Sequence, residues 1–222
     1  MKNILIIGSN RGIGLALTKE YAKENKVTAL CRKSSDELKQ IDSINIIEDA
    51  EVTDEKKLFA ISEKLGDLKF DTVIHVSGIW TNDNLFSDTP DWSALTKAFE
   101  VNSIAPLKAV SIFKRNMKEG TRLGLVSSRM GSIGDNDSGS KYAYRMSKAA
   151  LNAAGKGFAV DFKEEGISVA VLHPGFVQTD MTNGNGNMTP TESAQGIFKV
   201  MDNLSMNNTG EFWHANGEKL PW

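Results

Sequence analysis

The stretch Ile4-Leu-Ile-Ile-Gly8-Ser-Asn-Arg-Gly12-Ile-Gly14-Leu decides the fold, because it joins an apolar run to a helical pattern through a glycine-rich turn. Glycines at these positions let the backbone turn sharply and approach a pyrophosphate closely. The helix that follows would offer free N–H groups and the positive end of its dipole to that phosphate. The context favours dinucleotide binding, and a plain strand–helix turn is the alternative, since glycine is common in turns.

Outward from this turn, short apolar runs alternate with helical patterns. The runs are continuous rather than alternating, which is typical of parallel strands buried on both faces. The expected strands are Ile4–Ile7, Val27–Leu30, Ile44–Ile47, Thr72–Val76, Leu123–Ser127, Val169–Leu172 and a short last one near Glu211–Trp213. The expected helices are Gly12–Lys23, Asp54–Leu65, Asp91–Met117, Tyr142–Phe162 and Thr191–Asp202.

This alternation predicts an α/β fold with one Rossmann-type doubly wound parallel sheet of about seven strands and helices on both faces. No linker divides the chain, so we expect residues 1–222 to form a single domain. Pro106 should kink the helix Asp91–Met117 or end its first half. The polar, glycine-containing segments Ser132–Lys141 and Thr182–Thr189 are expected to be loops, and we expect the second to be mobile.

Composition excludes several classes of protein. The 222 residues carry a formal net charge of -2, so there is no basic excess for nucleic acid. No run approaches the length of a membrane helix, and Ile4–Ile7 is too short for a signal-peptide core, so we expect no membrane partner. The single Cys31 is compatible with a reducing compartment, and we expect a cytoplasmic protein. Three histidines and one cysteine show no metal-ligand spacing, so no metal is expected.

The end of the second expected strand bears on the choice of cofactor. A site that prefers NAD usually places an acid there, where it binds the ribose 2′-hydroxyl. This chain has Arg32 and Lys33 instead, and Arg11 in the glycine loop could reach the same region. Guanidinium groups bind a 2′-phosphate, so the sequence favours NADP(H) over NAD(H). The alternative is that Arg32 is a solvated surface charge.

Tyr144 and Lys148 are separated by three residues at the start of a helical pattern, which places both side chains on one helix face. A free tyrosine has a pKa of about 10, and a neighbouring ammonium group would lower it and make the hydroxyl a better proton shuttle. The spacing alone is equally typical of a surface helix. Ser127 and Ser128 end the fifth expected strand, where a hydroxyl could bind a substrate oxygen, although serine is also common in such turns.

With these residues assembled, the chain resembles the short-chain dehydrogenase/reductase family. The resemblance rests on Gly8-x-x-x-Gly12-Ile-Gly14, Asn102, Ser128 in Ser-Ser-x-x-Gly, Tyr144-x-x-x-Lys148, and Pro174-Gly175 followed by Thr179-Asp180-Met181. These motifs are in the family's order and span most of the chain. Tyr-Ala-Tyr-Arg-Met-Ser-Lys, His-Pro-Gly-Phe-Val-Gln-Thr-Asp-Met and the final Leu-Pro-Trp are similar to the C-factor-like and Sniffer-like carbonyl reductases.

The resemblance implies an NADP(H)-dependent oxidoreductase, specifically a carbonyl reductase, that acts on a small carbonyl or alcohol. It also implies a homodimer or homotetramer. Tyr144 would be the general acid/base, Lys148 would bind the nicotinamide ribose and lower the tyrosine pKa, and Ser128, with Ser127 as the fallback, would orient the carbonyl. Asn102 would hold a water that links Lys148 to solvent. The implied cofactor-binding residues are Gly8, Asn10, Arg11, Gly12, Ile13, Gly14, Arg32, Glu51, Val52, Gly78, Tyr144, Lys148, Pro174, Gly175, Val177 and Thr179.

One segment departs from the family. His75-Val76-Ser77-Gly78 stands where the family has Asn-Asn-Ala-Gly, which weakens the expected support of the sheet centre and of the cofactor's adenosine side. His75 could be catalytic, but a strand-end histidine is more often a packing residue. The altered segment slightly favours an alternative function, an NADP(H)-binding regulatory or signalling protein with little turnover. The four family residues Asn102, Ser128, Tyr144 and Lys148 argue against that alternative.

Overall fold

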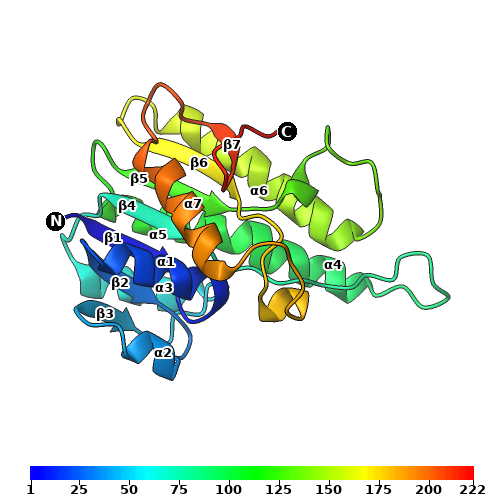
Figure 1. Cartoon of the computed structure of the whole chain (residues 1–222), viewed down its shortest axis with the longest axis horizontal. Helices are drawn as coiled ribbons and strands as arrows, with labels where there is room; N and C mark the ends of the chain where they lie inside the picture. Colours follow the sequence, from blue (N-terminus) through cyan, green and yellow to red (C-terminus); the bar gives the residue numbers. More distant parts are fainter.

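A computed structural model describes residues 1–222 and confirms the predicted α/β fold with one doubly wound sheet (Figure 1). Seven parallel strands pair in the order β3-β2-β1-β4-β5-β6-β7. The strands are β1 (Asn3–Ile7), β2 (Lys26–Leu30), β3 (Ile44–Ile47), β4 (Thr72–His75), β5 (Arg122–Val126), β6 (Ser168–His173) and β7 (Glu211–His214). The direction of winding reverses between β1 and β4, and open α/β sheets bind ligands in the crevice at such a point.

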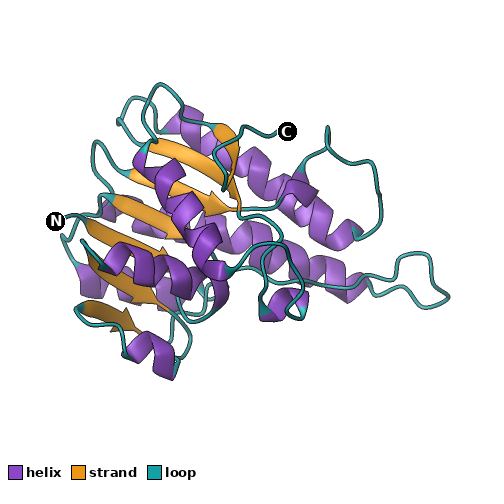
Figure 2. Cartoon of the chain, in the orientation of Figure 1, coloured by secondary structure: helices purple, strands orange, loops and turns teal.

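Helices cover both faces of the sheet (Figure 2). On one face, α1 (Gly12–Ala22) and α7 (Pro190–Asp202) pack together and contribute Leu17 and Ile197 to a buried core. On the other, α3 (Glu55–Leu65), α5 (Ala105–Phe113) and α6 (Tyr142–Asp161) supply Leu58, Phe113 and Leu151 to a second core. The sheet therefore has two buried faces, which explains why its strands are apolar throughout.

One short helix was not predicted. The four-residue α2 (Asp36–Lys39) begins after Ser35, whose hydroxyl accepts a hydrogen bond from the Leu38 N–H at 3.2 Å. Four residues are too few to show a helical period, so only the serine cap signals this helix. No helix in the structure combines the length and apolar character needed to cross a membrane.

Pro106 interrupts the long predicted helix, as expected. The segment consists of α4 (Trp92–Phe99), a π-helical turn (Glu100–Ile104), α5 and a final 3₁₀ turn (Lys114–Asn116). Pro106 lies in the first turn of α5, where a missing N–H is tolerated. The π turn directly before it changes the backbone bonding, because proline cannot donate to the carbonyl four residues back. This turn carries Asn102.

The two predicted loops are held by more bonds than their compositions suggest. In Thr182–Thr189 and its approach, Gln178 N donates to Met188 O and Asn187 N donates to Phe176 O, each at 2.9 Å. The expectation that this segment is mobile therefore finds no support in its bonding. The loop Ser132–Lys141 is fastened by Arg145, whose Nε donates to the Gly139 and Ser140 carbonyls at 3.0 Å and whose Nη2 donates to Ser138 Oγ at 2.8 Å.

Candidate active site

The carboxyl ends of β1, β4, β5 and β6 meet at one edge of the sheet. They lead into Gly8, Ser77-Gly78, Ser127-Ser128 and Pro174-Gly175 respectively. Because neighbouring parallel strands end at the same edge, segments far apart in sequence converge there. The sequence-predicted site residues thus come from one side of the molecule.

The glycine loop is shaped by contacts that no side chain could share. Gly8 has φ +95°, in the region that favours glycine. A Cβ at Gly14 would lie 1.9 Å from the Gly8 carbonyl oxygen. The helix α1 then begins at Gly12, and no side chain caps its first N–H groups. A cradle of this shape, with free donors at a helix start, fits a dinucleotide pyrophosphate.

Asn10 holds the glycine loop to the segment after β2. Its Oδ1 accepts from Ser35 N at 2.5 Å, and its carbonyl accepts from Ser35 Oγ at 2.8 Å. The Asn10 side chain therefore has a structural partner in this arrangement, whereas the sequence placed it among the cofactor contacts. Ile13 lies in the first turn of α1 and packs against the core beneath the loop.

The two arginines predicted to bind a 2′-phosphate each have a carboxylate partner. Arg11 Nη1 is 2.9 Å from Asp180 Oδ2, and Arg32 Nη1 is 3.8 Å from Glu51 Oε2. Both guanidinium groups are largely exposed. Arg11 thus joins the glycine loop to the segment after β6, and the binding of a 2′-phosphate by the two arginines stays a prediction.

The same two segments also touch through Gly12 and Thr179. A Cβ at Gly12 would lie 3.3 Å from the Thr179 Cγ2. Val177 is buried and forms an isolated bridge with Met188, while the Pro174 carbonyl accepts from Ser193 Oγ at 2.7 Å. The predicted nicotinamide-side residues are therefore fixed against the glycine loop on one side and α7 on the other.

Tyr144, Lys148 and Ser128 meet at the centre of the site. Tyr144 and Lys148 project from the first turns of α6, and both side chains are buried. Ser128 follows β5, its hydroxyl accepts from Met130 N at 3.2 Å, and it lies close enough to Tyr144 to lower the pKa of that hydroxyl. Gly131 brings this segment onto α6, because a Cβ there would lie 2.7 Å from the Lys148 carbonyl carbon. The expected trio is thus assembled, with Ser128 rather than Ser127 at the tyrosine.

Ser127 has a different environment. Its hydroxyl donates to Asn152 Oδ1 at 2.6 Å and lies 3.4 Å from the Lys148 carbonyl. These are buried contacts between β5 and α6. Ser127 therefore joins the sheet to the helix that carries Tyr144.

Burial sets the protonation of the central pair. It raises the pKa of Tyr144 to about 12, and the neighbouring Ser128 side chain acts in the opposite direction. It lowers the pKa of Lys148 to about 8. The Lys148 Nζ donates to the Val126 carbonyl at 3.1 Å and lies 5.8 Å from the centre of the Tyr144 ring. Burial is the largest influence on the pKa of Tyr144, and the expected lowering by Lys148 stays a prediction.

The Asn102 side chain binds two other segments, at Ile79 and at Ser147. Its Oδ1 accepts from Ile79 N at 2.8 Å and its Nδ2 donates to Ile79 O at 3.0 Å. The same Nδ2 donates to Ser147 Oγ at 3.1 Å. A Cβ at Gly78 would lie 3.2 Å from Asn102 Oδ1 and 3.4 Å from Lys148 Nζ. Asn102 thus fixes the segment after β4 against α6, a role that the sequence did not indicate.

His75 lies inside the sheet and stays neutral. It is buried, its Nε2 has no hydrogen-bond partner, and burial followed by the charge on Lys148 lowers its pKa to about 3. A group that remains uncharged through the neutral range makes a poor acid for a reaction near pH 7. The packing interpretation of His75 is therefore the better one.

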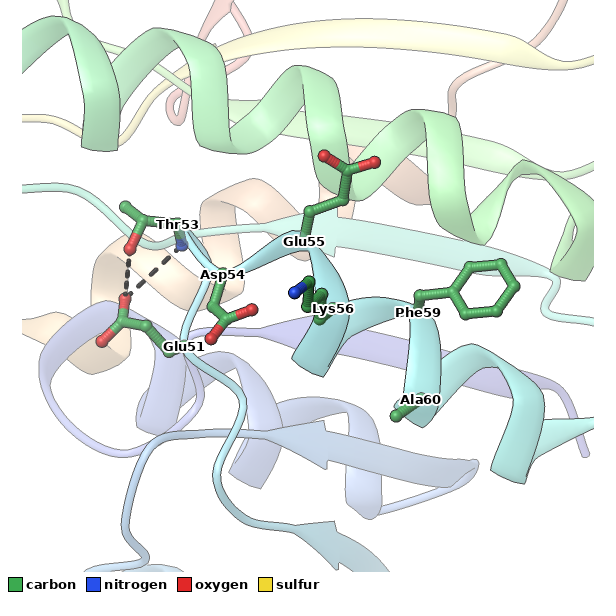
Figure 3. Close-up of a pocket in the computed structure, with 7 residues that line it drawn as sticks. All are labelled: Glu51, Thr53, Asp54, Glu55, Lys56, Phe59 and Ala60. Atoms are coloured by element: carbon green, nitrogen blue, oxygen red, sulfur yellow. Dashed lines mark hydrogen bonds between the residues drawn. The ribbon is translucent and has the colours of Figure 1, made fainter.

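The adenine side of the predicted site borders a shallow hollow of about 840 Å³ (Figure 3). Glu51 lies at its edge, and its Oε1 accepts from Thr53 Oγ1 at 3.2 Å. The hollow otherwise belongs to the exposed start of α3, and Val52 is buried beneath it. It contains none of Tyr144, Lys148 and Ser128. The lining residues are Glu51, Thr53, Asp54, Glu55, Lys56, Phe59 and Ala60.

Two contacts of the segment after β4 lie beside the central pair, and the sequence predicted neither partner. Asp83 is buried and its Oδ2 accepts from Ala143 N at 2.7 Å, which satisfies a free donor at the start of α6. Trp80 lies against Tyr144, with ring centres 4.7 Å apart. Both belong to a segment without regular structure, where no hydrophobic period marks a residue as structural.

The comparisons with known proteins agree with this geometry. The short chain dehydrogenase family model matches residues 2–189. The chain is 33% identical to 1-hydroxy-2-glutathionyl-2-methyl-3-butene dehydrogenase of Rhodococcus sp. (strain AD45), over 100% of both proteins. It is 37% identical to the C-signal of Myxococcus xanthus, over 66% of this chain and 87% of that protein. The structure superposes on the NADPH bound carbonyl reductase from chicken fatty liver with a TM-score of 0.87 and 28% identity, covering 100% of this chain and 99% of the other.

The family match spans the glycine loop, the Tyr144–Lys148 pair and the segment after β6, and the fold is that of the solved relative. This chain belongs to the short-chain dehydrogenase/reductase family and is an NAD(P)-dependent oxidoreductase that acts on small molecules.

Proposed function

We propose that the protein is an NADP(H)-dependent carbonyl reductase in which Tyr144 is the general acid/base. The observation that carries this proposal is the buried Tyr144 beside Ser128, with the Lys148 Nζ 5.8 Å from the centre of its ring. Tyr144 would donate its proton to the carbonyl oxygen, and Ser128 would donate a hydrogen bond to the same oxygen. The bound nicotinamide would supply the hydride.

The protonated state of the Tyr144 hydroxyl fits the role of acid in the reductive direction. With a pKa of about 12, the hydroxyl carries its proton throughout the neutral range and can act as an acid. Lys148, with its pKa lowered to about 8, keeps most of its charge at neutral pH and would help to return a proton to Tyr144. Asn102 would preserve this arrangement by holding Ile79 and Ser147 rather than by contacting the substrate.

The remaining predicted residues would hold the cofactor. Gly8, Gly12 and Gly14, with the N–H groups at the start of α1, would take the pyrophosphate. Arg32 and Arg11 would exchange their exposed carboxylate partners for a 2′-phosphate. The chicken carbonyl reductase is an NADPH complex, which supports the same preference here. The other proposed contacts are Asn10, Ile13, Glu51, Val52, Gly78, Pro174, Gly175, Val177 and Thr179.

The test compares Tyr144→Phe with Tyr142→Phe, a matched control on the same helix whose ring packs on Phe86. NADPH oxidation is followed with aldehydes, diketones and quinones. Because the Rhodococcus relative is named for a glutathionyl alcohol, a glutathione-conjugated alcohol is added with NADP⁺. We expect Tyr144→Phe to lose at least about 100-fold in kcat/KM and to keep its NADPH affinity. Equal rates in the two variants would contradict the role of Tyr144.

A regulatory or signalling protein that binds NADP(H) with little turnover is the second candidate. It is favoured by the similarity to the C-signal of Myxococcus xanthus and by the altered His75–Gly78 segment. Tight NADPH binding with no turnover on the whole panel would move the assignment to this candidate.

We further propose a single domain over residues 1–222, a cytoplasmic location, and a homodimer or homotetramer. The oligomer would pair the helices α4, α5 and α6, whose exposed side chains include Trp92, Leu107 and Val160. Apolar side chains exposed on neighbouring helices are typical of an interface between subunits. The molar mass measured by light scattering tests the assembly.

A further inference from the structure

The segment that joins β4 to α4 lies against Tyr144 and the start of α6. Figure 1 shows this segment extending beyond the start of α4. Trp80 lies on the Tyr144 ring at 4.7 Å between centres, and Asp83 binds the Ala143 N–H at 2.7 Å. These contacts fix the segment along the first turn of α6, beside the proposed reacting hydroxyl.

Lys141 lies next to this segment and carries a positive charge that no carboxylate neutralises. Its Nζ lies 5.9 Å from the centre of the Trp80 ring and donates to Asn82 Oδ1 at 3.4 Å. No carboxylate lies within ion-pair distance of it, whereas Arg11, Arg32 and Arg129 each have one. The acidic side chain on the same segment, Asp83, is buried and turned to the helix backbone.

We propose that Trp80, Asn82 and Lys141 form a substrate subsite for a carboxylate. The substrate class would be a carbonyl compound with a flat apolar body and a carboxylate at its far end. Trp80, 41% exposed, would offer its ring to the apolar body, between the Tyr144 ring and the Lys141 Nζ that both lie near it. Lys141 and the Asn82 amide, which has no acceptor of its own, would each donate to one carboxylate oxygen.

The order of these groups sets the geometry of recognition. Two contacts in series, of 4.7 Å and 5.9 Å, separate the Tyr144 ring from the Lys141 charge. In the proposed complex, a carbonyl at Tyr144 and a carboxylate at Lys141 would stand at opposite ends of one molecule, with an aromatic or similar spacer across Trp80.

This subsite rests on the proposed carbonyl reductase function, and binding tests it independently of turnover. Calorimetry on the NADP⁺-loaded protein compares 4-acetylbenzoate with its methyl ester, which differ only in the charge. We expect the wild type to bind the acid about fivefold more tightly than the ester, as a partly exposed ion pair provides. Lys141→Met should remove this preference, Lys141→Arg should keep it, and added salt should weaken it.

Lys163→Met is the matched control, because Lys163 is exposed beyond the far end of α6. It should bind both compounds as the wild type does. Equal affinities for acid and ester in the wild type, or a preference that survives in Lys141→Met, would overturn the subsite. Binding of the acid without any turnover on the ketone panel would keep the subsite and contradict the reductase, so the two failures are distinguishable.

Discussion

Replacing Lys148 by methionine should stabilise the folded protein near pH 7 and abolish its proposed reductase activity. Lys148 is 3% exposed, and burial lowers its pKa from 10.5 to about 8. Keeping the charge inside the folded protein at about pH 7 therefore costs about 3 kcal/mol, since one pKa unit is worth about 1.4 kcal/mol. Loss of the 3.1 Å hydrogen bond to Val126 O offsets about 1 kcal/mol of the gain. The expected net stabilisation is about 2 kcal/mol.

The dependence on pH separates this effect from a general change in packing. The unfolded chain binds a proton on Lys148 up to about pH 10.5, while the folded protein releases it near pH 8. The free energy of unfolding of the wild type therefore rises with pH between about pH 8 and pH 10.5 because of Lys148. Lys148→Met lacks this rise. Urea unfolding followed by tryptophan fluorescence should show the two proteins converging as pH approaches about 10. Parallel curves for wild type and Lys148→Met would refute the assigned pKa and its cause.

Three further substitutions test other parts of the site. Gly14→Ala places a Cβ 1.9 Å from the Gly8 carbonyl oxygen, so we expect a loss of about 1–3 kcal/mol in urea unfolding and at least tenfold weaker NADPH binding in fluorescence titrations. Arg32→Glu should shift the ratio of kcat/KM values toward NADH by at least about tenfold, because it repels a 2′-phosphate; an unchanged ratio would exclude Arg32 from the cofactor site. Between about pH 7 and pH 5, the wild type should lose about 2 kcal/mol of folding free energy through His75, and His75→Asn should not show this loss. The pKa of His75 is about 3 when folded and 6.5 in its ordinary state, so acid favours the unfolded chain; an equal acid loss in both proteins would contradict this.

Local patterns predicted the fold and the central pair of the site. The continuous apolar strands and the glycine turn at Gly8 specify a parallel sheet, because each signal depends only on neighbouring residues. The spacing of Tyr144 and Lys148 likewise fixes their shared helix face. What the sequence could not provide was the pKa of Tyr144, whose direction depends on burial by chain segments distant in sequence.

Long-range hydrogen bonds account for the other differences. Asn102 is expected to hold a water near Lys148, and its amide also binds Ile79 and Ser147. Neither partner is marked by a period or a turn signal. Asp83 was missed for the same reason, because its link to Ala143 joins an irregular segment to a helix start. Such contacts follow from the packed fold and not from local sequence.

The choice between NADP(H) and NAD(H) depends on an exchange of partners. Arg11 binds Asp180 at 2.9 Å and Arg32 lies 3.8 Å from Glu51, and both pairs are exposed to solvent. An exposed ion pair contributes about 1 kcal/mol or less, so a 2′-phosphate can replace either carboxylate at small cost. A ribose 2′-hydroxyl carries no charge, so its contact with an arginine does not compensate for the free energy lost when the ion pair breaks. The proposed preference for NADP(H) therefore does not require unpaired arginines, only carboxylate partners that bind more weakly than the phosphate.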